Sequence, residues 1–364
     1  MQVKAAVTRE KGKFALETVE LAAPKTGEVL VRLVATGICH TDTAVLNQFL
    51  PVTFPMVLGH EGVGIVEETG DGVLDLAPGD HVIMTFPSCG VCDHCKEGHP
   101  YACDDNFTMF FGGNYRDGTK RMKTLDGLDV GVLFGQSSFA TYAVADARNT
   151  IKVDPEVDLK ALCSLGCGIQ TGAGAVLNRM APRPGSAIAI FGLGAVGLAG
   201  VMAAKIAGCS TIIGVHSRRG RDLGLEFGAT HVIDSRTEDV TARIREITGG
   251  KGVNYALEAT GVPEIMIKML DSMAKEGLAV TVSVTGDIEV PIKLEPHIMN
   301  PSVTLAGCVE GASNPKVFIP ELVKFYKEGR LPVDRLNKYY KFEEIEQAME
   351  DSHKGLTVKP ILVF

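Results

Sequence analysis

Between about residue 168 and residue 306, short apolar runs alternate with longer stretches whose apolar residues recur at helical spacing. The apolar runs are "SAIAIFG", "TIIGV", "HVID", "VNYALEATG" and "LAVTVSV"; the stretches between them are "AVGLAGVMAAKIAG", "RDLGLEFG", "VTARIREIT" and "EIMIKMLDSMAKEG". Strands that alternate with helices form parallel sheets, because each helix carries the chain back to the start of the next strand. The pattern therefore predicts an α/β region built on a doubly wound parallel sheet, with "PSVTLAG" as a candidate last strand.

The first third of the chain has a different pattern, in which apolar runs typical of strands are separated by glycine-rich breaks. These runs include "GEVLVRLVATGIC", "HEGVGIVEETG" and "GDHVIMTF", and "PGD" at Pro78 to Asp80 is a turn signal. The last stretch predicts the helices "FIPELVKFYKEG" and "FEEIEQAMED", followed by the apolar end "VKPILVF". We expect a compact, mostly β domain with long loops before the α/β region.

Length and charge narrow the class of protein. A chain of 364 residues, 45% hydrophobic and 22% charged, predicts two globular domains. The net charge of −8 disfavours nucleic acid as a partner. The uncharged stretch Ala187 to Ala204 reaches the length of a membrane span, but its glycines favour a buried strand, turn and helix, so no membrane partner is expected. The start, "MQVKAAVTREKGKF", has no apolar signal segment, and a cytoplasmic location is expected.

Four of the nine cysteines lie in one loop, residues 89–103, with the spacing C-x2-C-x2-C-x7-C. Four thiolates so close together fill the tetrahedral shell of Zn²⁺ and leave no open position. We predict a structural zinc held by Cys89, Cys92, Cys95 and Cys103. Unrelated buried thiols, a redox pair and a nucleic-acid zinc ribbon are the alternatives, and the acidic chain gives the last little support.

A glycine-rich turn, "GLGAVG", follows the predicted strand "SAIAIFG" and precedes a predicted helix. Glycines there let the backbone approach a dinucleotide pyrophosphate, whose charge the helix N-terminus favours. The candidate cofactor-binding residues of this turn are Gly192, Gly194, Ala195, Val196 and Gly197.

The carboxylate that binds the adenosine ribose of NAD about 20 residues beyond such a turn is missing. The segment "GVHSRRGRD" offers His216, Ser217 and Arg218 instead. Arginine binds phosphate in a bidentate manner and suits the 2′-phosphate of NADP(H). We therefore expect NADP(H) rather than NAD(H), with an exposed basic turn at a helix start as the alternative.

Three further candidates for metal ligands are dispersed: Cys39 in "GICHTD", His60 in "LGHEGVG" and Cys167 in "LGCGIQTGAGA". Two thiolates and one imidazole leave a fourth position for water or substrate, as in catalytic zinc sites. Spacing alone does not select these three from nine cysteines and nine histidines.

Together and in this order, the motifs resemble the zinc-dependent alcohol dehydrogenases of the medium-chain dehydrogenase/reductase family from about Met1 to Phe364. The resemblance implies a GroES-like catalytic domain, split into residues 1–168 and 307–364, around an inserted Rossmann domain at 169–306. It also implies two zinc ions per chain, with Cys39, His60 and Cys167 as the catalytic ligands. The remaining implied roles are a proton acceptor (Thr41), a partner of the ligand histidine (Asp42), a carboxylate that approaches the metal (Glu61), and pyrophosphate contacts (His40 and Lys359).

The resemblance extends to substrate and assembly. "GICHTDTAV" and "LPVTFPMVLGHEG" are most similar to the aryl- and allylic-alcohol branch. This implies the oxidation of a bulky aromatic or allylic primary alcohol to its aldehyde with transfer of hydride to NADP⁺, in a homodimer or homotetramer formed through edge strands. Phe86, Leu133 and Phe134 fall near family substrate-pocket positions, although core packing explains each of them as well.

One departure from the family concerns the proton relay, because Ala44 stands where many members have a histidine. It keeps open a reductase of the same fold that acts on a conjugated or iminium substrate. An NAD-preferring general alcohol dehydrogenase and a non-catalytic NADP-binding protein also stay open at this point.

Overall fold

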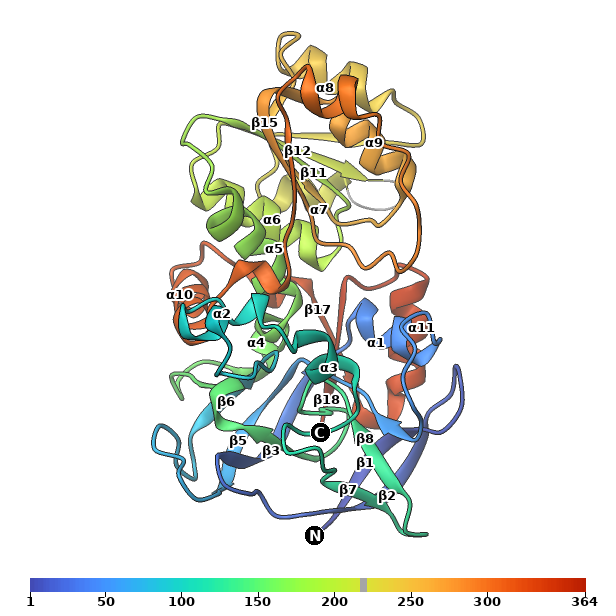
Figure 1. Ribbon diagram of the computed structural model, residues 1–364. Coiled ribbons are helices and arrows are strands. Elements are labelled where there is room, and N and C mark those ends of the chain that lie inside the picture. Colours follow the sequence, from blue (N-terminus) through green and yellow to red (C-terminus); the bar gives the residue numbers. More distant parts are fainter. Residues whose placement is uncertain (217–220) are drawn as a thin grey trace. The chain divides into compact units, whose positions relative to one another are not determined.

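A computed structural model describes residues 1–216 and 221–364 (Figure 1). The chain divides into two compact units. Unit 1 comprises Met1–Cys167, Asn314–Lys327 and Pro332–Phe364; unit 2 comprises Gly168–Ser313 and Glu328–Leu331. Unit 2 thus continues beyond the boundary at 306 that the sequence predicts. The reason is local packing: Gly311 accepts a hydrogen bond from Asn178 Nδ2 (3.0 Å) and lies close against the backbone of Gly174.

Unit 1 is the mostly β part of the chain. A closed barrel has the strand order β1-β2-β7-β8-β4, and a second sheet has the order β10-β6-β5-β3-β18-β17, with β9 also paired to β3 (Figure 1). The barrel strands are β1 (Gln2–Thr8), β2 (Ala15–Leu21), β4 (Met56–Val57), β7 (Met122–Thr124) and β8 (Asp129–Val132). The strands of the second sheet are β3 (Glu28–Gly37), β5 (Gly62–Thr69), β6 (His81–Met84), β9 (Tyr142–Asp146), β10 (Thr150–Lys152), β17 (Asn337–Lys341) and β18 (Lys359–Val363).

The long strand β3 runs between two apolar clusters of unit 1. Val29, Val31 and Leu33 pack in one cluster, whereas Leu30 packs in the other, as the two-residue period of a strand requires. Short helices connect and flank the strands: α1 (His40–Leu46), α2 (Asp93–Lys96), α3 (Asn106–Phe111), α4 (Leu159–Leu162), α10 (Pro315–Lys327) and α11 (Ile345–His353).

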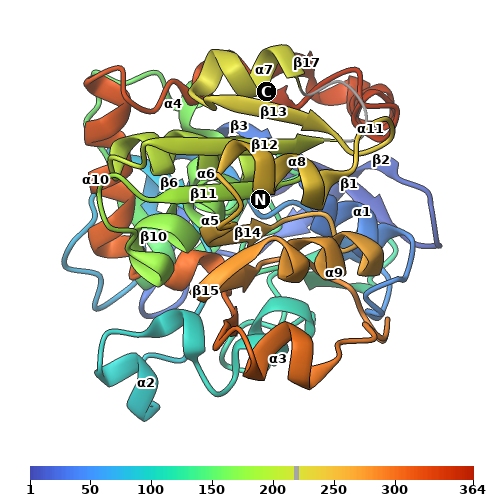
Figure 2. The same cartoon turned by 90° about the horizontal axis from the view of Figure 1, so that it is seen from above.

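Unit 2 is an entirely parallel six-stranded sheet with the order β13-β12-β11-β14-β15-β16 (Figure 2). Numbered within the unit, this order is 3-2-1-4-5-6, that of a Rossmann fold. The strands are β11 (Ala187–Phe191), β12 (Thr211–His216), β13 (His231–Asp234), β14 (Val253–Glu258), β15 (Met273–Thr281) and β16 (Thr304–Gly307). The helices are α5 (Gly168–Gly174), α6 (Ala195–Ile206), α7 (Arg221–Phe227), α8 (Val240–Ile247) and α9 (Pro263–Asp271).

One predicted element is wrong. The helix predicted over "EIMIKMLDSMAKEG" ends at Asp271, and Met273 already begins strand β15. Met273 pairs with Val253 of β14 and is buried, so pairing within the sheet overrides the helical spacing of these residues. Among the described helices, none has both the length and the apolar composition needed to cross a bilayer.

The glycine-rich turn generates a prediction about stability. A Cβ at Gly197 would overlap the carbonyl oxygen of Gly192, whereas a Cβ at Gly194 would meet no atom within 4 Å. In a helix interior, alanine is favoured over glycine by about 1 kcal/mol, but overlap with backbone costs about 1–3 kcal/mol. The overlapped atom at Gly197 is backbone and cannot move aside, so the cost lies at the upper end of this range. We therefore expect Gly197→Ala to lower the free energy of unfolding by about 2 kcal/mol and Gly194→Ala to change it by less than about 1 kcal/mol. Denaturant titration of both variants checks this, and equal stability of the two would contradict it.

Candidate metal centres and cofactor turn

Three elements of unit 1 bring Cys39, His60 and Cys167 together. Cys39 directly precedes α1, His60 lies in the turn before β5, and Cys167 follows a 3-10 turn at Cys163–Gly166. One ligand atom of each residue lies within 4.8 Å of those of the other two. Residues separated by more than a hundred positions thus form one cluster of two thiols and an imidazole.

A buried carboxylate orients the imidazole of His60. Asp42 Oδ1 lies 2.9 Å from His60 Nδ1 and accepts a hydrogen bond from Gly59 N (3.0 Å), while Oδ2 accepts one from Cys39 N (3.0 Å). An ionised carboxylate only accepts hydrogen bonds, so Nδ1 is the protonated nitrogen and Nε2 carries the lone pair.

The second ring nitrogen of His60 fits a bound cation. Nε2 is buried and has no hydrogen-bond partner among the described residues, and a ring nitrogen of His60 lies within 4.8 Å of both thiol sulfurs. A buried acceptor without a partner costs about 1–3 kcal/mol, which a metal bond would relieve. A hydrogen bond with Cys167 lowers the pKa of the Cys39 thiol well below its ordinary value, against the effect of burial. The thiolate is the form that binds metals.

Next to the cluster lies a buried ion pair that the sequence did not reveal. Lys359 Nζ is 2.5 Å from Glu61 Oε2 and donates to the carbonyl oxygen of Ile38 (3.1 Å), and both side chains are almost fully buried. Burial raises the pKa of Glu61, and the ammonium group opposes that rise. Burial alone would lower the pKa of Lys359, but the carboxylate of Glu61 raises it above its usual value. Gly37 makes room for the pair, since a Cβ there would overlap the Glu61 carboxylate.

The first turn of α1 carries the other residues predicted near the metal. Thr41 Oγ1 lies 3.9 Å from Cys39 Sγ, and His40 is exposed. Ala44, in the same helix, offers no group that could pass on a proton.

An aromatic stack begins at His60, in the cluster of two thiols and an imidazole. Phe134 stacks on His60 with ring centroids 4.7 Å apart, and Phe110 of α3 stacks on Phe134 at 4.4 Å. Phe86 meets Phe110 edge-on at 6.2 Å. Phe134 also has a positive φ of 50°, which is rare for a bulky residue and persists only where the surroundings hold it. Leu133 is fully buried in the same apolar cluster.

The four-cysteine loop forms a second cluster, in which one sulfur from each of Cys89, Cys92, Cys95 and Cys103 lies within 4.8 Å of the others. Burial alone would raise the pKa of Cys89, but the backbone N–H groups of Val91 and Cys92 lower it to about 6. Burial raises the pKa of Cys103 to about 12. The loop thus provides both the donor set and backbone hydrogen bonds that stabilise thiolate charge.

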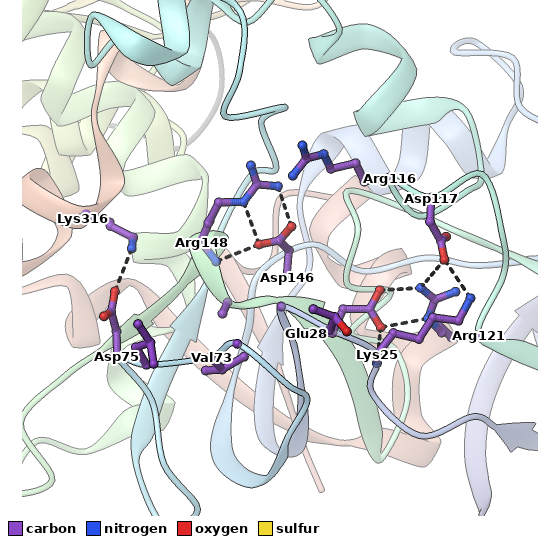
Figure 3. Close-up of a pocket in the computed structure, with 15 residues that line it drawn as sticks. Lys25, Glu28, Val73, Asp75, Arg116, Asp117, Arg121, Asp146, Arg148 and Lys316 are labelled. Atoms are coloured by element: carbon purple, nitrogen blue, oxygen red, sulfur yellow. Dashed lines mark hydrogen bonds and ion pairs between the residues drawn. The ribbon is translucent and has the colours of Figure 1, made fainter.

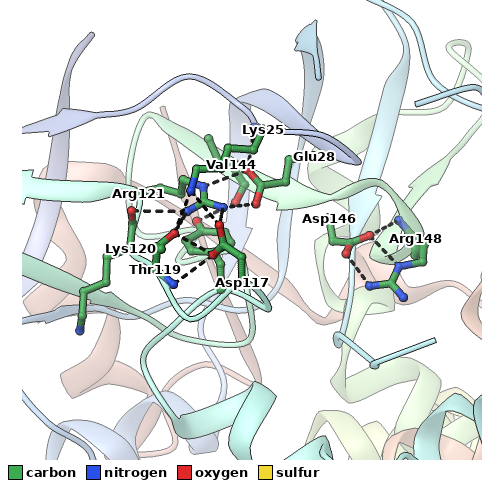
Figure 4. Close-up of polar contacts among 10 residues, drawn as sticks. Lys25, Glu28, Asp117, Thr119, Lys120, Arg121, Val144, Asp146 and Arg148 are labelled. Atoms are coloured by element: carbon green, nitrogen blue, oxygen red, sulfur yellow. Dashed lines mark hydrogen bonds and ion pairs between the residues drawn. The ribbon is translucent and has the colours of Figure 1, made fainter. Parts of the chain in front are cut away.

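Beside this loop, unit 1 has a cavity of about 660 Å³ with charged walls (Figure 3). Its charges are largely paired with one another, as in the contacts of Arg121 with Glu28 and Asp117 (Figure 4). Arg148 lies in the same wall. It pairs with Asp146 (2.6 Å) and donates from Nη1 to the carbonyl oxygen of Cys89 (2.7 Å), which connects the wall of the cavity to the cysteine loop.

In unit 2, the glycine-rich turn lies at the carboxyl end of β11, between the strands at which the sheet order reverses. This position is the usual ligand site of such sheets. Gly192 has a φ of 95° and Gly194 is exposed at the N-cap of α6. Ala195, Val196 and Gly197 form the first turn of that helix, whose N-terminus favours an anion. His216 ends β12, whereas Ser217 and Arg218 lie outside the described residues.

Glu258, whose role the sequence did not reveal, ends β14 beside this turn. Its fully buried carboxylate accepts hydrogen bonds from Thr260 N (2.5 Å), Gly261 N (2.9 Å) and Ser283 Oγ (2.8 Å), among others. The signal was an acidic residue at the end of an apolar strand, in "ALEATG". Glu258 holds the loops after β14 and β15 in place.

Comparison with known proteins defines the class. The family model of the alcohol dehydrogenase GroES-like domain matches residues 25–155 of this chain. The family model of zinc-binding dehydrogenases matches residues 195–328. A geraniol dehydrogenase of Castellaniella defragrans is 41% identical over 100% of this chain and 98% of its own length.

Two solved structures are similar over 100% of this chain and 99% of their own chains. An alcohol dehydrogenase zinc-binding domain protein from Burkholderia ambifaria has 47% sequence identity and a TM-score of 0.97. A benzyl alcohol dehydrogenase from Acinetobacter calcoaceticus has 43% sequence identity and a TM-score of 0.96. The fold and the matches define a zinc-binding dehydrogenase with GroES-like and Rossmann domains, as predicted. The chain belongs to the zinc-dependent alcohol dehydrogenases of the medium-chain dehydrogenase/reductase family, in their aryl- and allylic-alcohol branch.

The contact between Arg148 and Cys89 generates a prediction. Arg148→Met removes the hydrogen bond to the Cys89 carbonyl oxygen, and the half-exposed site limits the expected loss of stability to about 1 kcal/mol. We also expect the cysteines of the loop to react several-fold faster with a thiol reagent. Arg236→Met is the matched control, because Arg236 makes the same ion pair with an aspartate two residues earlier, Asp234, in the other unit. Equal thiol reactivity in the two variants would contradict the role of Arg148.

Proposed function

We propose that this chain oxidises a bulky aromatic or allylic primary alcohol to its aldehyde, reversibly, by zinc-dependent hydride transfer to NADP⁺. The observation that carries this proposal is the buried cluster of Cys39, His60 and Cys167, in which Nε2 of His60 has no described partner except the two thiols around it. A family relationship to zinc-binding dehydrogenases supports a metal there.

In this proposal Cys39, His60 and Cys167 hold a catalytic zinc, and the four cysteines of loop 89–103 hold a structural one. When bound at the three-donor site, zinc supplies a Lewis acid for the alcohol or carbonyl oxygen of the substrate. Asp42 keeps Nε2 of His60 unprotonated for the metal. The thiolate of Cys39 adds negative charge that favours a cation.

The hydroxyl of Thr41 takes the proton of the alcohol, since it lies within 3.9 Å of a ligand sulfur. Ala44 has no group that could pass that proton on, so the proton would leave to water or to the ribose of the cofactor. Glu61 would be the carboxylate available to the metal during ligand exchange. Lys359 is a further candidate for the pyrophosphate, and its ammonium group is paired with Glu61 in the structure. His40, exposed at the start of α1, is the freer candidate for the pyrophosphate.

The glycine turn at Gly192 to Gly197 and the N-terminus of α6 bind the pyrophosphate of the cofactor. His216 stands where a carboxylate would repel a 2′-phosphate, and Ser217 with Arg218 supplies hydroxyl and guanidinium donors for it. These residue types support NADP(H) as the cofactor.

Two observations support an aromatic or allylic substrate. The relatives are named for geraniol and benzyl alcohol. The rings of Phe134, Phe110 and Phe86 start at the ligand His60, and aromatic rings prefer stacked or edge-on aromatic partners. Phe107 and Phe111, which contact each other at 5.1 Å, extend the apolar surface along α3.

We further propose a homodimer or homotetramer formed through β16. This strand is the edge of the parallel sheet, and Leu305 within it and Val309 just after it are exposed. An unpaired strand edge with exposed apolar side chains pairs readily with a second chain.

The proposed metal sites predict two zinc ions per chain. Cys167→Ser should lose one zinc and all alcohol oxidation, and its melting temperature should stay close to that of the wild-type protein. Cys103→Ser should lose the other zinc and melt at a lower temperature, because its loop has little apolar packing of its own. Atomic absorption and thermal melting of the purified proteins check both, and one zinc in the wild-type protein would rule out the proposed pair of sites.

Turnover followed by nicotinamide absorbance tests substrate and cofactor together. With benzyl or cinnamyl alcohol we expect at least tenfold higher kcat/KM than with ethanol, and a strong preference for NADP⁺ over NAD⁺. Arg218→Ala should lower kcat/KM with NADP⁺ at least tenfold and leave that with NAD⁺ nearly unchanged, because only NADP⁺ carries the 2′-phosphate.

Arg330→Ala serves as a control for the loss of an exposed arginine far along the chain. Equal use of the two cofactors, untouched by Arg218→Ala, would make the basic segment a solvated turn.

The absence of the relay histidine at Ala44 favours a second candidate function, the reduction of a conjugated or iminium substrate. Failure to oxidise any of these alcohols in a protein with two zinc ions would support that candidate.

A further inference from the structure

A buried segment of unit 1 lies along the turn that carries His60. Ser138 N donates to the carbonyl oxygen of Gly59 (3.0 Å), and Phe139 N donates to that of Leu58 (3.0 Å). Ser137 Oγ donates to the carbonyl oxygen of Val57 (2.6 Å). The segment therefore pairs with the backbone immediately before the metal-ligand histidine.

Within this segment, Gln136 contacts the backbone on both sides of Glu61. Its side chain is fully buried; Nε2 donates to the carbonyl oxygen of His60 (3.0 Å), and Oε1 accepts from Gly62 N (3.1 Å). Nε2 also donates to the carbonyl oxygen of Thr85 (3.3 Å). A primary amide has two N–H groups and one carbonyl, so Gln136 uses all three groups on backbone partners.

Thr85 continues the connection to the third ligand. Its fully buried hydroxyl donates to the carbonyl oxygen of Gly166 (2.7 Å), the residue directly before Cys167. Two hydrogen bonds connect Thr85 to Asn149. Thr85 N donates to the carbonyl oxygen of Asn149 (2.9 Å), and Asn149 Nδ2 donates to the carbonyl oxygen of Thr85 (3.2 Å). Hydrogen bonds thus lead from the His60 peptide through Gln136 and Thr85 to the peptide before Cys167.

The three-donor site needs such a connection between its ligands, whereas the four-cysteine loop does not. Neighbouring ligands in that loop are only a few residues apart, so local turns set their spacing. His60 and Cys167 are distant in sequence, and apolar packing is not directional enough to fix the separation of two backbones. Buried hydrogen bonds are directional, and each costs free energy when it is lost without replacement.

We infer that Gln136 and Thr85 are positioning residues that set the separation of His60 Nε2 and the Cys167 sulfur for a bound zinc ion. The inference rests on the proposed function, in which these residues bind that ion. The positive φ of Phe134 and of Ser137, each 50°, shows that the segment is held in an uncommon backbone conformation. That conformation places the amide of Gln136 on the ligand turn and the ring of Phe134 on His60.

Zinc release from the full-length, zinc-loaded protein tests this inference. A chromophoric chelator reports release over time, and Cys167→Ser identifies which phase belongs to the three-donor site. Gln136→Met keeps the side-chain volume but removes every polar contact, and Thr85→Val removes only the hydroxyl. We expect both to release the zinc of the three-donor site about 10–100-fold faster, as for other residues that orient metal ligands, with release from the cysteine loop unchanged.

Thr85→Ser is the matched control, because it restores the hydroxyl and should release zinc at nearly the wild-type rate. Substitution of the zinc by Co²⁺ gives a second readout, since the thiolate-to-metal absorption band depends on ligand geometry. We expect that band to shift in Gln136→Met and Thr85→Val and to stay in place in Thr85→Ser. If Gln136→Met does not fold, the valine and serine variants of Thr85 decide the question.

Wild-type release rates and an unshifted band in Gln136→Met and Thr85→Val would overturn the inference. So would equal acceleration of both zinc phases, which would indicate a general loss of stability. A wild-type protein that holds zinc only in the cysteine loop would instead overturn the proposed function. The failure of each idea is therefore recognised by a different result.

Discussion

The carboxylate of Asp42 holds the start of α1 and the turn of His60 against each other. It is fully buried and bonded to Cys39 N, Gly59 N and His60 Nδ1. A buried carboxylate is tolerated only when its oxygens are hydrogen-bonded, so these contacts are as necessary for the fold as for the site. Because Asp42 binds Nδ1 of His60, the other ring nitrogen, Nε2, is left for a metal beside the two thiols.

The same rule governs the other buried charges of unit 1. Glu61 and Lys359 neutralise each other beside the cluster, and Arg121 is paired with Glu28 in the wall of the charged cavity. Removing one partner from such a pair leaves an isolated charge in a medium that solvates it poorly, which is far more costly than the pair itself. Around the proposed metal, the pairing of Glu61 with Lys359 also limits the negative charge that would otherwise add to that of the thiolates.

In unit 2, the parallel sheet creates the cofactor turn. The order of the strands reverses between β11 and β14, and ligands of such sheets usually bind at the carboxyl ends of the strands next to that reversal. Gly192 and Gly197 allow the turn after β11 to pack tightly, and Glu258 fixes the loop after β14 through its hydrogen bonds. The turn after β11 and the loop after β14 are therefore both held by contacts within unit 2.

Features that depend on local pattern could be predicted from the amino-acid sequence. Alternating strand and helix periods defined the Rossmann sheet. The close spacing of Cys89, Cys92, Cys95 and Cys103 defined one cluster of four thiols, because neighbours along the chain are also neighbours in space. Cys39, His60 and Cys167 could be joined only through resemblance to a family, since no local spacing connects them. The partners of Lys359, Gln136 and Glu258 became known only from the folded chain, as did the strand that replaces the predicted helical end at Met273. These features depend on contacts between distant segments, where the free energy of burial and pairing outweighs the weak preferences of the residues themselves.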